Sequence, residues 1–265
     1  MTAFLDQRVP LAFAHRGGAA HNPENSWPAF EHAIGLGYRY LETDLHATAD
    51  GVLVAFHDPA LDRVTDRAGR IARLPYAEVA AARIGGTEPI PKAEDLLGAW
   101  PQARFNLDVK DEPAIAPLAQ LLSRTGAWDR VCVTSFSARR LRATRQALGR
   151  PVCMSLSPSG VAAVKTALFR PDFHPTAGPA MARRLAAAGV RCAQVPIRVA
   201  TRGFIRRAHD LGLQVHVWTV NDRLDMNGLL DLGVDGIMTD DTVALREVLT
   251  GRGLWHPGER AGEVA

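Results

Sequence analysis

Eight short, apolar runs rich in strand-forming residues recur along the chain, and helical patterns lie between most of them. The runs are LAFAHR (11–16), YRYLETDLH (38–46), RFNLDVK (104–110), RVCVTSF (130–136), PVCMSL (151–156), RCAQVP (191–196), LQVHVWTV (213–220) and GIMTD (236–240). This alternation predicts an α/β protein with the (β/α)8 TIM barrel fold. A doubly wound open sheet is less favoured, because HRGGAAHNPEN after the first run does not match the glycine-rich phosphate turn of that fold.

The segment from about 46 to 91 is too long for one loop and one helix, and it contains a further extended run, GVLVAFHD. We expect a small insertion that begins as a hairpin extension of the second strand, with its turn at Asp50-Gly51. No linker of Gly, Ser and Pro divides the chain. Residues 1–265 are therefore expected to form a single domain.

The composition excludes several classes of protein. No run of 18 apolar residues is present, so no integral membrane association is expected. The N-terminus lacks a secretory pattern, and the cysteines Cys132, Cys153 and Cys192 lie in separate apolar runs, which favours buried, reduced thiols and a cytoplasmic location. The net charge of +3 comes from scattered basic residues, so no nucleic-acid partner is expected. The oligomeric state stays open.

Charged residues and histidines gather where three of the predicted strands end. Active sites of such barrels lie at the C-terminal ends of the strands, so these side chains should meet. They are His15, Arg16, Glu42, Asp44, His57, Asp108 and Lys110. Grouping so many ionisable groups is costly for a mere scaffold, and this favours a functional site.

Phosphoryl chemistry accounts for this set of residues. The carboxylates of Glu42, Asp44 and Asp108 are hard oxygen ligands that suit one divalent cation, Mg²⁺ or Ca²⁺. Together with that cation and the two basic side chains, they leave a charge that a phosphodiester monoanion neutralises. The two histidines can serve as general acid and general base near neutral pH. A phosphorylated small molecule is the expected substrate.

The chain resembles the glycerophosphodiester phosphodiesterase family of the bacterial type. The resemblance rests on HRG, PEN, E-x-D, D-G-x-x-V-x-x-HD and L-x-R-x-T in order, followed by FNLDVK, VTSF and VHVWTVND. It implies a barrel with an insertion after strand two, and metal-dependent hydrolysis of glycerophosphodiesters to sn-glycerol 3-phosphate and an alcohol. It also implies roles for the listed residues: catalysis by His15 and His57, metal binding by Glu42, Asp44 and Asp108, and phosphate contacts by Arg16 and Lys110.

One departure from the family pattern keeps alternatives open. Asp108 stands where the bacterial enzymes usually have Glu, and related sphingomyelinase D enzymes carry Asp. The alternatives are a phospholipase D, a lysophospholipase D or a sphingomyelinase D-like phosphodiesterase, and a phosphate-binding barrel without catalysis. The HDPALDRVTD stretch and the lack of paired cysteines favour the glycerophosphodiester group.

Further residues are expected in supporting or structural places. Trp218 and Phe136 should wall the substrate site, while Glu24 and Asn25 should either support the site or cap the following helix. Asp58 should orient His57 or cap a turn. Residues expected to be structural are His216 in the core, Asp235 and Asp240 at strand ends, and His21, His32, His46, His174, His209 and His256 on the surface or in loops.

Overall fold

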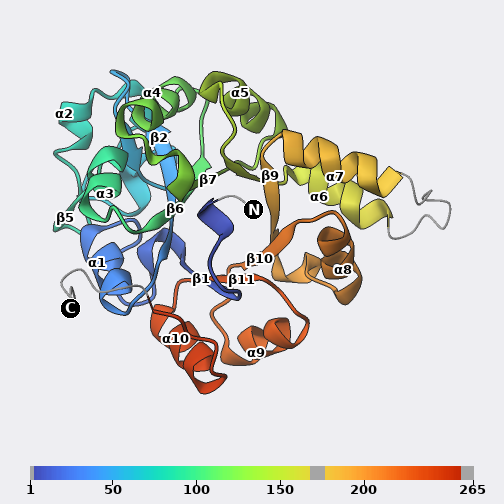
Figure 1. The fold of residues 1–265 in the computed structure, drawn as a ribbon. Coiled ribbons are helices and arrows are strands. Elements are labelled where there is room, and N and C mark those ends of the chain that lie inside the picture. Colours follow the sequence, from blue (N-terminus) through green and yellow to red (C-terminus); the bar gives the residue numbers. More distant parts are fainter. Residues whose placement is uncertain (1–2, 168–176, 258–265) are drawn as a thin grey trace, which may run out of the picture.

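Eight parallel strands close into a barrel in the computed structural model, which describes residues 3–167 and 177–257 (Figure 1). The strands are β1 (Leu11–Ala14), β2 (Tyr40–Ala47), β6 (Arg104–Val109), β7 (Val131–Thr134), β8 (Cys153–Ser155), β9 (Val190–Pro196), β10 (Gln214–Trp218) and β11 (Gly236–Thr239). Each strand pairs with its neighbour, and pairing of β1 with both β2 and β11 closes the ring. The predicted (β/α)8 fold is confirmed, with every strand at its expected place.

Helices lie between the strands and surround the barrel (Figure 1). They are α1 (Trp27–Gly35), α3 (Ala93–Ala99), α4 (Ile115–Thr125), α5 (Ala138–Leu148), α6 (Pro158–Ala167), α7 (Ala177–Ala187), α8 (Arg202–Asp210), α9 (Arg223–Asp231) and α10 (Thr242–Gly251). Ser26 and Ser137 accept hydrogen bonds from backbone amides of α1 and α5, as helix-capping serines do. No helix in the described part of the chain is long and apolar enough to cross a membrane.

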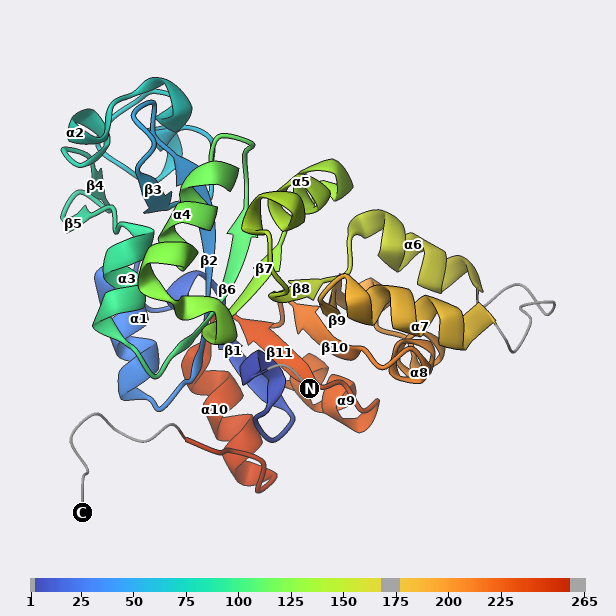
Figure 2. The ribbon, with the colours of Figure 1, turned by 45° about the horizontal axis from the view of Figure 1, so that its top comes forward.

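The insertion after strand two is confirmed and stands beside β2 (Figure 2). It contains β3 (Leu53–Ala55), α2 (Tyr76–Val79), β4 (Arg83–Ile84) and β5 (Glu88–Pro89). β3 pairs antiparallel with β2, so the expected hairpin at Asp50-Gly51 is present. The insertion has its own buried apolar cluster, formed by Val54, Phe56, Leu61, Ile71, Val79, Ala82, Ile84 and Ile90. This cluster fixes the segment that carries His57.

The N-terminal segment packs against the N-terminal end of the barrel. Phe4 and Leu5, in the 3₁₀ helix Ala3–Leu5, are buried against Leu11 and Phe13 inside the barrel. The Tyr40 hydroxyl donates a hydrogen bond of 2.7 Å to the Phe4 carbonyl oxygen. The interior is therefore covered at this end by apolar packing, and the predicted catalytic and metal-binding side chains lie at the other end.

The cysteines and most of the additional histidines lie where the sequence predicts. All three cysteines are buried and form no disulfide, and His216 is fully buried in the barrel interior, where burial lowers the pKa of His216 to about 3. The side chains of His21 and His209 are largely exposed, His256 is exposed and His32 is partly exposed. The expectation for His174 lies outside the described residues. His46 differs from its prediction and belongs to the site below.

Candidate active site

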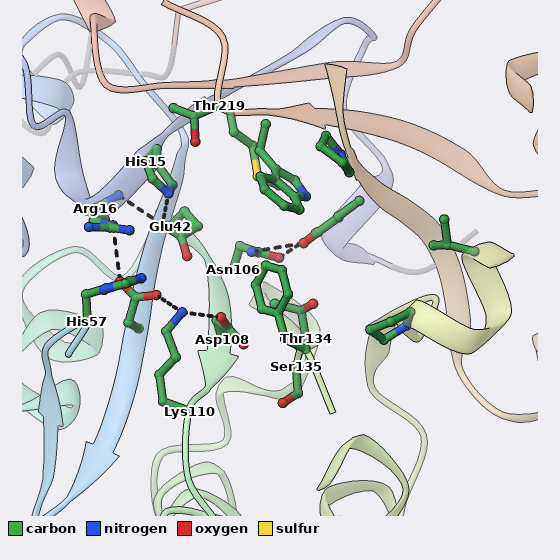
Figure 3. Close-up of a pocket in the computed structure, with 18 of the residues that line it drawn as sticks. His15, Arg16, Glu42, His57, Asn106, Asp108, Lys110, Thr134, Ser135 and Thr219 are labelled. Atoms are coloured by element: carbon green, nitrogen blue, oxygen red, sulfur yellow. Dashed lines mark hydrogen bonds and ion pairs between the residues drawn. The ribbon is translucent and has the colours of Figure 1, made fainter. Parts of the chain in front are cut away.

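A cavity of about 360 Å³ opens at the C-terminal ends of the strands (Figure 3). The sequence-predicted residues that line it are His15, Arg16, Glu42, Asp44, His57, Asp108, Lys110, Phe136 and Trp218. The structure thus brings together every primary candidate from β1, β2, β6, β7, β10 and the insertion. Glu24 and Asn25 lie behind the lining and contact it.

A tight turn at the end of β1 presents His15 and Arg16 to the cavity. Arg16 adopts a left-handed backbone conformation with φ of 50°, and its amide donates a 2.9 Å hydrogen bond to Glu42 Oε2. Gly17 follows with φ of 83°, and a Cβ there would stand 2.9 Å from the Ala29 Cβ. The glycine of the HRG motif is therefore required both by the backbone and by the close approach of α1.

Lys110 neutralises two carboxylates that face each other across neighbouring strands. Asp44 on β2 and Asp108 on β6 are register partners, so their charges would repel if nothing stood between them. Lys110 Nζ lies 2.8 Å from Asp44 Oδ1 and 2.7 Å from Asp108 Oδ2. Burial alone would lower the pKa of Lys110, but these two carboxylates outweigh it and raise the pKa. The ammonium therefore stays charged.

Two buried carboxylates at this site, Glu42 and Asp108, have raised pKa values. Burial, together with the charge of Asp44, raises the pKa of Glu42 to about 7. Burial also raises the pKa of Asp108, and its Oδ1 atom is buried without a hydrogen-bond partner. Asp44 behaves differently: its burial is outweighed by Lys110 and Arg16, and its pKa is lowered. The site as built from protein groups alone carries an excess of buried negative charge.

The donor chemistry fits the predicted divalent cation. Three carboxylates supply hard oxygen donors, and the unpartnered oxygen of Asp108 is the kind of atom that a cation satisfies. The convergence is incomplete, because the carboxylates are not among the described groups whose ligand atoms all lie within 4.8 Å of one another. Lys110 stands between two of them instead. That Glu42, Asp44 and Asp108 bind a metal stays a prediction.

Asp240 holds the imidazole of His15. Its Oδ1 lies 2.7 Å from His15 Nδ1, and its Oδ2 accepts a 2.9 Å hydrogen bond from the Asn221 side chain. Burial alone would lower the pKa of His15, but the hydrogen bond to Asp240 and the charge of Glu42 raise it. Asp240 was expected to be structural at a strand end, and the structure adds its contact with the predicted catalytic His15. The only sequence signal was its position at the end of the last strand, which neighbours β1.

A chain of ion pairs connects His57 with Arg16. His57 Nδ1 lies 2.6 Å from Asp58 Oδ1, so Asp58 orients His57. Arg63 binds Asp58 and also Glu24, and Glu24 in turn binds Arg16 at 3.1 Å. The hydrogen bond from Arg63 lowers the pKa of Asp58 to about 2. Sequence reasoning assigned no role to Arg63, although it stands in the quoted L-x-R-x-T motif.

Asn25 and His46 support the site from buried positions. Asn25 donates a 3.1 Å hydrogen bond to Asp44 Oδ2 and accepts one of 2.7 Å from the Thr43 hydroxyl, while Ser26 caps the helix. His46 was expected on the surface or in a loop, and this was wrong. It is buried in β2, with Nδ1 2.7 Å from Asp111 Oδ2 and Nε2 3.2 Å from the His57 carbonyl oxygen. Asn25 therefore contacts a predicted metal-binding carboxylate, and His46 contacts the backbone of the predicted catalytic His57.

Apolar and aromatic side chains form one wall of the cavity. The rings of Phe136 and Trp218 meet edge to face, with their centroids 5.3 Å apart. Leu156 and Val161 continue the wall, and Phe136 is 61% exposed although it is a large apolar residue. Arg198, which sequence reasoning did not single out, adds a cation to the lining. Such a wall suits an apolar or cationic substituent of a substrate.

Comparisons with known proteins identify similar chains. The model of the glycerophosphoryl diester phosphodiesterase family matches residues 15–244. The chain is 40% identical to the "probable glycerophosphodiester phosphodiesterase 2" of Mycobacterium tuberculosis over 95% of both chains. It is 26% identical to a human lysophospholipase D, covering 93% of this chain and 87% of that protein.

Solved structures agree with the fold. A Silicibacter pomeroyi protein whose name contains glycerophosphoryl diester phosphodiesterase superposes with a TM-score of 0.78 at 26% identity, covering 97% of this chain and 100% of that one. An Oleispira antarctica phosphodiesterase in complex with the product sn-glycerol-3-phosphate superposes with a TM-score of 0.75 at 21% identity. That likeness covers 91% of this chain and 97% of the other.

Replacing Asp240 with Asn should lower the pKa of His15. The amide has no charge, and its single acceptor oxygen faces two donors, from His15 and Asn221. We expect a fall in this pKa, because the charged acceptor that raises it is lost. Because the raised pKa then drops, the neutral imidazole persists to lower pH. The measurement is an NMR titration of the imidazole in metal-free protein. Asp241→Asn is the matched control, because Asp241 caps α10 and an amide can also cap it. An unchanged pKa in Asp240→Asn would contradict this role of Asp240.

Proposed function

Because the chain belongs to the glycerophosphoryl diester phosphodiesterase family, it is a phosphoric diester hydrolase, and we propose that it hydrolyses glycerophosphodiesters to sn-glycerol 3-phosphate and an alcohol. One observation carries this proposal. A single cavity at the strand ends holds two histidines and three buried carboxylates, and Arg16 and Lys110 contact those carboxylates. Glycerol 3-phosphate is the product bound by the similar Oleispira antarctica enzyme.

The charges of the site support a metal-dependent reaction. When all three carboxylates are ionised they carry −3, and Arg16 and Lys110, which contact them, carry +2, so one negative charge remains. Glu42, Asp44 and Asp108 would hold one Mg²⁺ or Ca²⁺ ion, which supplies Lewis-acid polarisation of a phosphoryl oxygen. The site would then be +1, and the monoanion of a phosphodiester neutralises it. Arg16 and Lys110 line the cavity and would stabilise negative charge on phosphate oxygens.

The two histidines divide the proton transfers in this proposal. His15 is the more buried, at 17% side-chain exposure, and its Nδ1–H donates a hydrogen bond to Asp240, which leaves Nε2 free to take a proton from water. His57 is 32% exposed and stands on the insertion at the edge of the cavity, where a leaving alcohol can depart. We therefore assign His15 as general base and His57 as general acid, which protonates the alkoxide.

A lysophospholipase D activity is the second candidate. The observation that favours it is the apolar wall of Phe136, Leu156, Val161 and Trp218, because such a wall can receive an acyl chain attached to the glycerol. The exposure of Phe136 leaves its ring uncovered at the mouth. The same chemistry would then act on a lysophospholipid and release the headgroup alcohol.

Chelation and Asp108 variants test the metal. Release of glycerol 3-phosphate from glycerophosphocholine should stop in EDTA and return with Mg²⁺ or Ca²⁺. Asp108→Asn keeps the size of the side chain but removes one charged donor, so the metal concentration for half activity should rise by at least about tenfold. Asp108→Glu should retain substantial activity, because the carboxylate remains. Unchanged metal affinity in Asp108→Asn would show that Asp108 is not a ligand, and full activity in EDTA would refute metal dependence.

Leaving-group dependence tests the assignment of His57. His57→Ala should lower the rate with glycerophosphocholine by roughly 10²–10⁴. With p-nitrophenol as leaving group, which needs no protonation, the same variant should regain much of its rate. His15→Ala is the comparison variant, since loss of the general base should slow both substrates alike. If His15→Ala is the variant that recovers, the two roles are reversed.

A comparison of headgroup and acyl dependence separates the two candidate substrates. If the wall receives an acyl chain, kcat/KM for lysophosphatidylcholine should exceed that for glycerophosphocholine, and Phe136→Ser should remove about 1.5–3 kcal/mol of that preference, or roughly tenfold or more. Leu224→Ser is the control, because Leu224 is an exposed apolar residue outside the cavity lining. No turnover of lysophosphatidylcholine, with glycerophosphocholine hydrolysis unaffected by Phe136→Ser, would leave glycerophosphodiesters as the substrates.

A further inference from the structure

Three cysteines from consecutive strands converge inside the barrel. Cys132 on β7, Cys153 on β8 and Cys192 on β9 are 0–2% exposed. Their Sγ atoms all lie within 4.8 Å of one another, and those of Cys132 and Cys192 are 3.9 Å apart. Within residues 3–167 and 177–257, no other group of three His, Cys, Asp or Glu ligand atoms is so close. The trio takes no part in the hydrolysis proposed above.

The spacing of the three sulfurs matches three-coordinate binding of one ion. With a bond to sulfur of about 2.3 Å, as zinc has, three sulfurs around a planar centre lie about 4.0 Å apart, and around a pyramidal centre they lie closer together. The observed separations of 3.9 Å to at most 4.8 Å require only small side-chain movements to reach that triangle. Zinc prefers a fourth protein ligand at a structural site, and the described group offers three. The geometry therefore favours a thiophile that is satisfied by three sulfurs.

The net charge of the ion and its three thiolates indicates which oxidation state this buried site favours. The trio is packed among Phe4, Leu11 and other apolar side chains, and burial raises the pKa of Cys132 far above that of an ordinary thiol. A monovalent or divalent ion bound by three thiolates would leave a net negative charge in this apolar layer, which is costly. A trivalent centre bound by three thiolates leaves none.

We propose that Cys132, Cys153 and Cys192 form a binding site for a trivalent, three-coordinate thiophile such as arsenite. Arsenous acid, As(OH)₃, reacts with three thiols to give one As(S)₃ centre and three waters. Each As–O bond is replaced by an As–S bond, and each thiol proton leaves with a hydroxide. Arsenic stays trivalent, so the step needs neither oxidant nor reductant.

The catalytic cavity offers the ligand a way in. Gln194 and Asn106 line the cavity floor, and their side-chain amides bind each other. Gln194 Nε2 also lies 3.8 Å from Cys192 Sγ and 4.0 Å from Cys132 Sγ. Gln194 therefore lies between the cavity and the sulfurs, and the proposal requires its side chain to rotate so that a small neutral molecule such as arsenous acid can pass.

Native mass spectrometry tests the site on the full, reduced chain. The protein is incubated with sodium arsenite in EDTA, without substrate, and freed of excess reagent by gel filtration. We expect one arsenic per chain and a mass gain of one arsenic atom less three hydrogens, because these are the only three cysteines in the sequence. A mass gain that shows one or two hydroxyl groups kept on the arsenic, or no arsenic at all, would overturn the three-sulfur site.

Single substitutions provide the second arm. Cys132→Ala, Cys153→Ala and Cys192→Ala should each weaken arsenite binding more than about tenfold, with the fold checked by circular dichroism. Binding that survives any one folded variant unchanged would contradict the proposal. If a variant does not fold, the mass gain of the wild-type protein still shows whether all three thiols bind the arsenic. Arsenite should also raise the thermal unfolding midpoint of the wild type, because it binds the folded trio by mass action. An unchanged midpoint at saturating arsenite would count against the site.

Discussion

The contact of one ammonium with two facing carboxylates underlies the whole candidate site. The register of β2 and β6 places Asp44 directly opposite Asp108, and burial denies both of them water. Without Lys110 the two charges would repel each other at close range in a medium of low dielectric constant. Lys110 Nζ lies within 2.8 Å of both, so the strand ends can stay ionised, buried and paired. The excess negative charge then falls on Glu42, whose pKa rises to about 7.

The remaining groups are arranged so that each histidine meets a carboxylate on one nitrogen and the cavity on the other. Asp240 fixes His15, and Asp58 fixes His57. Each of these carboxylates is itself held from behind, by Asn221 in one case and by Arg63 in the other. Because Arg63 also binds Glu24, the insertion is tied to the turn after β1. The distance between His15 and His57, the proposed base and acid, is therefore fixed by side-chain ion pairs as well as by the backbone.

Sequence reasoning succeeded where a local pattern carries the information. Alternating strand and helix patterns predicted the barrel, and charges placed at strand ends predicted the lining, because parallel strands bring their C-terminal ends to one rim. It failed where a contact depends on closure or register. Asp240 lies 225 positions from His15 and meets it because β11 closes on β1. His46 reads as an ordinary strand-end residue, and only the fold of the insertion over β2 buries it. The cysteine trio requires three strands to point sulfurs inward, and a one-residue shift in any strand would turn its sulfur away.

The barrel interior is layered. The charged side chains at the rim and the buried thiols lie in different layers, separated by the amide pair of Asn106 and Gln194. Aromatic rings and cysteines fill the end covered by Phe4 and Leu5. Above them, Asn106 and Gln194 satisfy each other through two hydrogen bonds, at 2.7 and 3.3 Å, and need no charge from either side. His216 lies in the same interior against Phe13, and burial holds its pKa near 3, so it adds no charge there. The charged groups at the rim thus rest on a neutral floor. Because that floor responds weakly to their field, Glu42, Asp44 and Asp108 act strongly on the cations beside them and on whatever cation or phosphate enters.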